Sequence, residues 1–528
     1  MSSIRRPRAV AVLAIALAGL LAACGTNSSE GGSSAAGGGT NVLTSSMPVT
    51  SNYDPDVLFE LQPLEITNAM YEGLVRYVPG GSEIEGVLAE SWTISPDGLT
   101  FTFALDPDAT FSDGSPVDSA AVQAAFERKA EIGSTPAYIL WPVSGYETPD
   151  AQTFVITLSQ PVNNFLYMLA SPAGSVITNV AAIEANASDG DDLGEEYLQT
   201  NSAGSGPYTL SEFVPDERVV LARNDDYWGE APQFDQIVFK VLPDTSSQRL
   251  QVEQGDIDLM QGVSPEAAAE LEDSSAVTVE SIAGFNLAFY QMNVTKAPFD
   301  DAAVRQALVR SIPFDEMVEA VWGKWATRSK QMLPADRLPT DMAVFDPPYE
   351  PDAFAEATAD LPKSEPVTLG LIAPDEGNVA ARVNDYVAEV LRDAGYEVEI
   401  TPVTSPEYFG MVNAPELAPN MIFSIQPDDG AHPDNWFSLF LKSGAALNVG
   451  GIGIPEADAL MDEANAVPAG QPIDEALYGR AGDILSEQVH FVPIADVPTR
   501  FVHSNDLSNL QMHFVVPPAV WLQNITKG

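Results

Sequence analysis

Few residues of this chain carry side chains suited to covalent or metal chemistry. The 528 residues include one cysteine, Cys24, and four histidines, His432, His490, His503 and His513. A single cysteine excludes disulfides within the chain, cysteine-rich zinc sites and iron–sulfur clusters. No histidine lies at short metal-ligand spacing from another, and the sequence lacks the Gly-x-Ser-x-Gly, Gly-x-x-x-x-Gly-Lys-[Ser/Thr] and His-Glu-x-x-His motifs. We therefore predict a protein without catalytic residues, metal or cofactor.

Cys24 stands at the end of a segment typical of bacterial export signals. A basic start, Arg-Arg-Pro-Arg, precedes an apolar run at Ala9–Ala23, and this run is shorter than the roughly 20 residues of a membrane-spanning helix. It leads into Leu-Ala-Ala-Cys-Gly, which resembles the lipobox of bacterial lipoproteins. The resemblance implies that residues 1–23 are a signal peptide, exported by the Sec or the Tat route, and that Cys24 is lipidated. Residues 24–40, rich in Gly and Ser, then form a flexible tether at the outer face of the cell membrane.

The charge of the chain narrows the classes of partner. It has 75 acidic and 24 basic side chains, a formal net charge of −51, and 45% hydrophobic residues. This apolar content distinguishes it from a disordered acidic tail. Nucleic acid is excluded because a phosphate backbone needs Lys and Arg to replace its counterions, and the same charge opposes docking on anionic lipid headgroups. No run after Ala23 reaches 18 apolar residues, so we expect no further membrane span. We also expect the protein to be a monomer.

Local patterns predict an α/β fold with mixed sheets. Alternating apolar residues on both sides of Pro96-Asp97-Gly98 predict a hairpin, because Asp-Gly supplies the backbone angles of a tight turn. Apolar residues at helical spacing predict a helix over 65–77. In the second half, alternation at 367–371, a helical stripe over 379–394 and alternation at 396–400 predict a right-handed parallel crossover.

Short motifs along the chain resemble those of one protein family, in the same order. They are Tyr-Glu-Gly-Leu-Val at 71–75, Gly-Ser-Gly-Pro-Tyr at 204–208, Asn-x-x-Tyr-Trp-Gly at 224–229, Gly-x-Ile-Asp at 255–258 and Ala-Pro-Phe-Asp-Asp at 297–301. Each motif alone is weak, but their order behind a lipobox is specific. Over nearly all of its length after the tether, the chain resembles the large substrate-binding proteins of ABC importers, of the peptide/nickel-binding type (solute-binding protein family 5).

The resemblance implies a periplasmic-binding-protein-like fold with two lobes joined by two hinge strands. Lobe I would comprise residues 41–286, with an extra subdomain at about 78–200, and lobe II would comprise residues 287–495. Residues 496–528 would return to lobe I. Proteins of this kind close about a hinge and bury the ligand between the lobes, where water is excluded.

The resemblance also implies a position for the amine of the ligand. Peptide-binding relatives place an Asp of lobe II on the α-ammonium, in a segment that corresponds to Gln-Pro-Asp-Asp-Gly-Ala-His-Pro at 426–433. Anchoring the comparison on its last two residues assigns this role to Asp429, and a shift of one residue would assign it to Asp428. Gln426, which stands where relatives have Trp, is a further candidate contact. Alternatively, Asp428 and Asp429 lie in a solvated surface loop and have no role in binding.

Five further residues are candidate ligand contacts by the same resemblance. Phe289 and Gln291 precede the Ala-Pro-Phe motif, where relatives line the cleft, and Tyr53 lies in another cleft-facing stretch of the family. Asn448 precedes a helix of lobe II. Trp436 follows the Asp segment, either as a wall of the pocket or as part of the core.

Together these features favour a lipid-anchored receptor that passes a small organic ligand to the membrane subunits of an ABC importer. Short peptides are the leading ligand class, and oligosaccharides and other non-peptide solutes are the alternatives. A secreted hydrolase with paired carboxylates is less favoured, because 75 acidic residues form many pairs by chance. A surface interaction protein is equally less favoured.

Overall fold

The structure, a computed structural model, describes residues 41–47, 53–57, 61–172, 175–191, 193–283, 286–334, 342–372, 376–411, 414–513, 515 and 520–528. The predicted signal peptide, Cys24 and the tether lie outside the described residues. The chain from Thr40 to Gly528 forms one compact unit. None of the helices in the described ranges combines the length and the apolar character needed to cross a bilayer.

The first large sheet has seven strands in the order β12-β19-β11-β1-β10-β9-β8. β1 runs parallel to β10 and β11, and the other neighbours are antiparallel. β19 belongs to the C-terminal segment that we expect to return to lobe I, and it lies between β11 and β12. The strands are β1 (Val42–Met47), β8 (Tyr208–Val214), β9 (Arg218–Arg223), β10 (Gln236–Val241), β11 (Leu259–Met260), β12 (Val277–Ile282) and β19 (Thr499–Ser504).

The second large sheet has six strands in the order β14-β18-β13-β17-β15-β16. β13 is antiparallel to β17 and β18, whereas β15 is parallel to β16 and β17. Every residue of β13 is buried, as expected for a central strand covered on both faces. The strands are β13 (Leu287–Met292), β14 (Thr327–Arg328), β15 (Val367–Ile372), β16 (Val398–Val403), β17 (Met421–Gln426) and β18 (Phe491–Asp496).

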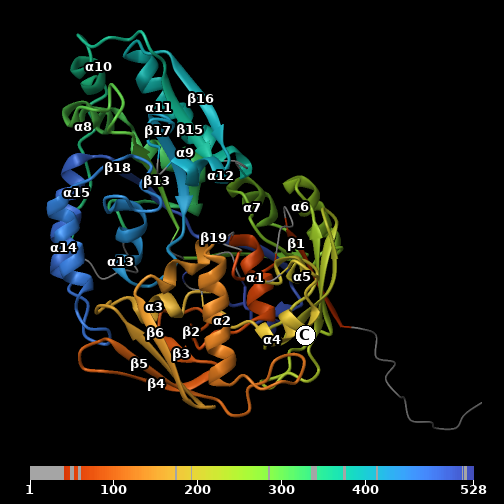
Figure 1. Ribbon diagram of the computed structural model, residues 1–528. Coiled ribbons are helices and arrows are strands. Elements are labelled where there is room, and N and C mark those ends of the chain that lie inside the picture. The colour runs from red at the N-terminus through yellow and green to blue at the C-terminus, as the bar shows by residue number, and fades with distance from the viewer. Residues whose placement is uncertain are drawn as a thin grey trace, which may run out of the picture. The chain divides into compact units, whose positions relative to one another are not determined.

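The predicted parallel crossover is confirmed in this sheet. α11 (Val379–Asp393) connects β15 to β16 and lies along them (Figure 1). Its stripe of Val383, Val387 and Leu391 is fully buried, and each such side chain contributes about 1.5–3 kcal/mol of burial free energy. Gly395 follows with a φ of 88°, the left-handed conformation that ends helices with glycine.

A four-stranded sheet, in the order β4-β5-β7-β6, contains the predicted hairpin. β4 and β5 pair around Pro96-Asp97-Gly98, and Gly98 has a φ of 71°, so the Asp-Gly prediction is confirmed. The strands are β4 (Ala89–Ile94), β5 (Thr100–Leu105), β6 (Val143–Asp150) and β7 (Thr153–Leu158). Two short pairs complete the strands: β2 (Val75–Tyr77) with β3 (Ile84–Gly86), and β20 (Leu507–Ser508) with β21 (Thr526–Lys527).

The helix predicted over 65–77 is wrong in its second half. α1 spans Leu61–Met70, and the chain then turns and enters β2, where Val75 pairs with Gly86. Gly73 also forms a bridge with Val176. Pairing with distant strands therefore overrides the local helical spacing, which does not distinguish a helix from a strand over a short apolar run.

The described residues also form the following helices. They are α2 (Ser119–Ile132), η1 (Thr135–Leu140), α3 (Phe165–Leu169), α4 (Val180–Asn186), α5 (Glu195–Leu198), α6 (Thr245–Gln254), α7 (Pro265–Leu271), α8 (Ala302–Ser311), α9 (Phe314–Trp322), η2 (Gly323–Trp325), α10 (Ala353–Ala357), η3 (Glu376–Asn378), α12 (Ser405–Met411), α13 (Pro433–Trp436), η4 (Phe437–Leu441), α14 (Pro455–Asn465), α15 (Glu475–Gln488) and η5 (Leu522–Asn524).

A buried ion cluster fixes α2 to the segment before α1. It consists of Asp54, Asp56, Arg128 and Lys129, all nearly inaccessible to solvent. The Arg128 guanidinium donates to both oxygens of Asp54, at 2.6 and 3.1 Å, and also to Asp56. Lys129 donates to the second oxygen of Asp56. Because each charge is paired and hydrogen-bonded, the cluster avoids the cost of an isolated buried ion.

Candidate ligand-binding site

One cavity of about 1120 Å³, called the large cavity below, lies between segments that are far apart in the sequence. Residues of η1 and of the stretch 160–168 form one wall. The opposite wall comes from residues between 429 and 447 and from the C-terminal end of α14. Pockets for drug-sized ligands have volumes of about 300–1,000 Å³, so the large cavity has room for a peptide of several residues.

Asp429 lies in the loop between β17 and α13 and contributes a carboxylate to the wall of the large cavity. It is only 8% exposed. Its Oδ1 accepts a hydrogen bond from Asn435 Nδ2 at 3.1 Å, and its Oδ2 accepts one from the Tyr138 hydroxyl on the opposite wall. Burial raises the pKa of Asp429, while the hydrogen bonds from Tyr138 and Asn435 lower it.

Asp428 lies behind Asp429 and is completely buried. Its Oδ1 accepts a hydrogen bond from the Gly430 N–H at 3.3 Å. Burial and the adjacent charge of Asp429 raise the pKa of Asp428 well above its usual range. Because two adjacent buried carboxylates do not both ionise readily, Asp429, with its two side-chain donors, is the one that ionises more easily.

Of the eight predicted ligand contacts, Asp429 alone is among the described residues that line the large cavity. Phe289 stacks on Phe491 at 4.3 Å between ring centroids, and Trp436 packs edge-on against Phe289. Gln426 donates to the Ser424 hydroxyl at 2.8 Å. Phe289 and Trp436 therefore lie in the core, and their predicted contact with a ligand stays a prediction.

Two other predicted residues donate hydrogen bonds to backbone carbonyls of residues that line the large cavity. Gln291 Nε2 donates to the Leu447 carbonyl at 2.8 Å, and Asn448 Nδ2 donates to the Lys442 carbonyl at 3.0 Å. Leu447 and Lys442 both line the cavity. Tyr53, in contrast, is buried in the core around the seven-stranded sheet and packs on Phe213. Its ligand role also stays a prediction.

A seam of hydrogen bonds joins the two walls beside the large cavity; the seam consists of Asn163 and Asn164 with His432, Asn435 and Asn465. Asn163 N donates to the Asn465 carbonyl at 2.9 Å, and Asn164 Nδ2 donates to Asn435 Oδ1 at 2.9 Å. His432 Nε2 lies 2.8 Å from Asn163 Oδ1. Because Asn435 also donates to Asp429, the seam is linked directly to the cavity carboxylate.

The tautomer of His432 follows from its two partners. Its Nδ1 accepts a hydrogen bond from the Asp434 N–H at 3.1 Å, which caps the start of α13. Its Nε2 therefore carries the proton and donates to Asn163. Burial lowers the pKa of His432 to about 3, so the ring is neutral at physiological pH.

No pattern in the sequence indicated Tyr138, Asn164 or Lys442 as cavity residues. Tyr138 belongs to η1, and its partner Asp429 is 291 positions away in the chain. Asn435 follows the Asp segment by a few residues, so a search of polar side chains near Asp429 would have found it. In the described part of the chain, no three His, Cys, Asp or Glu side chains form a group that could hold a metal ion.

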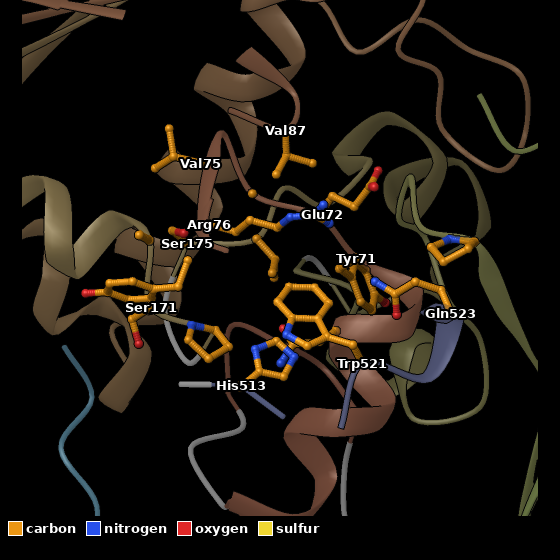
Figure 2. Close-up of a pocket in the computed structure, with 17 residues that line it drawn as sticks. Tyr71, Glu72, Val75, Arg76, Val87, Ser171, Ser175, His513, Trp521 and Gln523 are labelled. Carbon is orange, nitrogen blue, oxygen red and sulfur yellow. The ribbon is translucent and has the colours of Figure 1, made fainter. Parts of the chain in front are cut away.

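A second, smaller cavity of about 40 Å³ lies beside β2 and the C-terminal segment (Figure 2). Figure 2 shows the rings of Trp521 and His513 side by side, with centroids 3.9 Å apart. The Arg76 guanidinium lies 4.9 Å from the centroid of the Trp521 ring. Since a water molecule takes up about 30 Å³ of liquid, this cavity has room for water but not for a peptide.

Comparisons with known proteins show which family this chain resembles. The model of the family "Bacterial extracellular solute-binding proteins, family 5 Middle" matches residues 83–448. The "Probable D,D-dipeptide-binding periplasmic protein DdpA" of Escherichia coli K12 is 31% identical over 326 residues, which span 61% of this chain and 62% of that protein. The "Dipeptide-binding protein" of the same organism is 24% identical over 401 residues, which span 71% of this chain and 74% of that protein.

Solved structures share the fold. The periplasmic binding protein DppA of Helicobacter pylori, in complex with the peptide STSA, has a TM-score of 0.81 and 23% identity, with 92% of this chain and 98% of that chain covered. The dipeptide-binding protein of Pseudoalteromonas sp. SM9913, in complex with Met-Leu, has a TM-score of 0.80 and 21% identity, with 92% and 100% covered. The predicted two-lobed periplasmic-binding-protein fold is confirmed. The boundaries of the lobes stay a prediction.

Proposed function

Because this chain belongs to the bacterial extracellular solute-binding proteins of family 5, we propose that it captures a short peptide in the large cavity and delivers it to the membrane subunits of an ABC importer. One observation carries the proposal: a buried carboxylate, Asp429, faces a cavity of about 1120 Å³. The names of the two relatives and the peptides bound in the two similar structures support it.

Asp429 would receive the ammonium group of the peptide. An ionised carboxylate has about four acceptor sites, and the hydrogen bonds from Asn435 and Tyr138 use two of them. The remaining sites would form charge-assisted hydrogen bonds with the ammonium, in surroundings where water is largely excluded. Because Tyr138 and Asp429 come from opposite walls, a ligand bound at their junction would favour the closed arrangement.

Calorimetric titration with Ala-Leu and with N-acetyl-Ala-Leu tests this role. We expect acetylation, which removes the positive charge, to weaken binding by about 10- to 100-fold. The D429N variant should bind Ala-Leu more weakly by a similar factor and should no longer distinguish the two peptides. Equal binding of Ala-Leu by D429N and the wild type would contradict the role of Asp429.

The D428N variant distinguishes the two neighbouring acids. Asparagine resembles a protonated aspartic acid, so D428N should bind Ala-Leu within a few-fold of the wild type if Asp429 is the ligand carboxylate. The opposite result, with D428N impaired and D429N unaffected, would move the role to Asp428. Thermal unfolding of both variants without peptide shows whether each is folded.

The proposal includes a lipid anchor and the absence of turnover. We propose that Cys24 is lipidated, that the mature protein is a monomer and that it releases its ligand unchanged. Partitioning into the detergent phase of Triton X-114 should be lost in the C24A variant. Mass spectrometry of Ala-Leu after prolonged incubation should recover the intact dipeptide, and recovery of free amino acids would instead indicate a peptidase.

A further inference from the structure

The smaller cavity of Figure 2, called the small cavity below, is lined by three side chains with unpartnered polar atoms. Trp521 Nε1, His513 Nε2 and Asn68 Nδ2 are each buried and have no hydrogen-bond partner among the described residues. Trp521 and His513 are only 5% and 6% exposed. Because buried polar groups in native proteins are almost always hydrogen-bonded, three such atoms around one cavity indicate an occupant that accepts hydrogen bonds.

The backbone holds these side chains in place before any ligand binds. Met512 and Val520 form an antiparallel bridge, and His513 and Trp521 are the residues that follow each of them. The two rings stack with centroids 3.9 Å apart (Figure 2). Asn68 comes from α1, on the other side of the small cavity from the C-terminal segment in the sequence order. The three atoms therefore belong to a preformed site.

Arg76 is the one positively charged side chain among the described residues that line the small cavity. Its guanidinium lies 4.9 Å from the centroid of the Trp521 ring, and its Nε donates to Glu85 at 2.8 Å. Burial and the charge of Arg76 lower the pKa of His513 to about 3. The ring of His513 is thus neutral at physiological pH and donates from Nε2 when that nitrogen carries the single ring proton.

Glu72, the one acidic residue of the described lining, does not supply the missing acceptor. Its carboxylate accepts hydrogen bonds from the Tyr227 hydroxyl at 2.6 Å, from Ser205 Oγ at 2.8 Å and from Trp228 Nε1 at 3.0 Å. Figure 2 shows this carboxylate directed away from the ring of Trp521. The acceptor sites of Glu72 are therefore used by donors outside the small cavity.

The chemistry of the unpartnered atoms favours a small anion over water. Indole and amide nitrogens only donate hydrogen bonds. A monatomic anion only accepts them, whereas a water molecule must also donate two of its own. The positive charge of Arg76 adds an attraction that an anion feels and a water molecule does not. The volume of about 40 Å³ suits a single small ion.

We propose that the small cavity binds a halide ion, for which chloride is the probe, between Trp521 Nε1, His513 Nε2 and Asn68 Nδ2. The bound ion connects the C-terminal segment to α1, and Arg76 of β2 supplies the compensating charge. This inference is independent of peptide capture, because the small and the large cavity share none of the described residues that line them.

Differential scanning calorimetry in sodium chloride and in sodium gluconate, at equal concentration and ionic strength, tests the proposal. Gluconate is too large for the small cavity, so we expect Tm to be about 1–3 °C higher in chloride. W521F keeps an aromatic ring but lacks the N–H, and it should reduce this difference to below about 0.5 °C. R76Q should reduce the difference as well, and it decides the matter if W521F does not fold.

Matched variants control for general effects of the two salts. W322F removes another buried indole N–H that has no partner among the described residues, at a site outside the lining of the small cavity. R218Q removes an arginine that pairs with Glu212 and whose side chain is 37% exposed, close to the 34% of Arg76. Both variants should keep the wild-type difference between chloride and gluconate.

Crystals soaked in sodium bromide locate the ion directly. We expect an anomalous peak within hydrogen-bonding reach of Trp521 Nε1 and His513 Nε2 in the wild type, and none in W521F. A water molecule at this position in bromide, equal Tm values in the two salts, or the same loss in W521F and W322F would each overturn the proposal. A bromide peak without a salt-specific shift of Tm would indicate an adventitious ion only and would also overturn it.

Discussion

Replacing Arg128 by Met should destabilise the protein strongly, because it removes a guanidinium from the buried ion cluster. Asp54 would stay inaccessible to solvent without the donor that now contacts both of its oxygens. Removing one partner of a buried ion pair typically costs about 3–5 kcal/mol. At about 2.1 cal/mol/K per residue, the unit Thr40–Gly528 has an unfolding entropy of about 1 kcal/mol/K. We therefore expect Tm to fall by about 3–5 °C.

Differential scanning calorimetry of R128M measures this shift, and R218M provides the matched control. Arg218 pairs with Glu212 on the surface, where the two side chains are 37% and 44% exposed. An exposed pair is worth about 0–1 kcal/mol, so R218M should change Tm by about 1 °C or less. An equal shift in the two variants would refute the reasoning about burial.

The pH dependence provides a second check on R128M. In the wild type, burial raises the pKa of Asp54 and Arg128 opposes this rise. Without Arg128 the folded-state pKa of Asp54 should rise further above its unfolded value. A group with a raised folded-state pKa loses stability as pH increases through that pKa. The deficit of R128M should thus be smaller at pH 4 than at pH 8, and a deficit independent of pH would contradict the mechanism.

Three further variants test other parts of the molecule. Burial raises the pKa of Glu65 to about 8. The free energy of unfolding of the wild type, measured with urea, should therefore fall as pH rises from about 4.5 to 8, whereas that of E65Q should fall less. G206A places a Cβ 2.6 Å from the backbone of Ala69 and Met70 at the end of α1 and should cost about 1–3 kcal/mol, whereas G145A, with open space around it, should be neutral. N164A removes the hydrogen bond to Asn435 and should weaken Ala-Leu binding about 2- to 10-fold. The rate at which N164A releases Ala-Leu, measured by stopped flow, should be higher than that of the wild type. An unchanged release rate would contradict a role of Asn164 in closure.

Local structure was largely predictable because its causes are local. The hairpin around Gly98 and the crossover through α11 follow from turn residues and from apolar spacing within about 35 residues. The helix over 65–77 was wrong beyond Met70 because β2 pairs with β3 and Gly73 forms a bridge with Val176, about 100 residues further along the chain. Long-range pairing thus limits what apolar spacing predicts.

The candidate site was predictable only in part, for a related reason. The resemblance of the segment 426–433 singled out Asp429, which indeed lies in the cavity wall. Tyr138 is joined to it only by the folded arrangement of two distant segments. Gln291 and Asn448 came from the same resemblance, but they hold the backbone of the wall at Leu447 and Lys442 instead of lining it.

The seam joins the two walls through uncharged groups. Asn163 and Asn164 contribute amides, and burial keeps His432 neutral by lowering its pKa to about 3. Dissolved salt screens ion pairs, with a Debye length of about 8 Å at physiological ionic strength, but it has little effect on hydrogen bonds between neutral groups. In a chain with a net charge of −51, the hydrogen bonds of the seam are thus insensitive to dissolved salt, whereas the Tyr138–Asp429 contact beside it includes a carboxylate. The seam should therefore hold the two walls together with nearly the same strength in dilute and in saline surroundings.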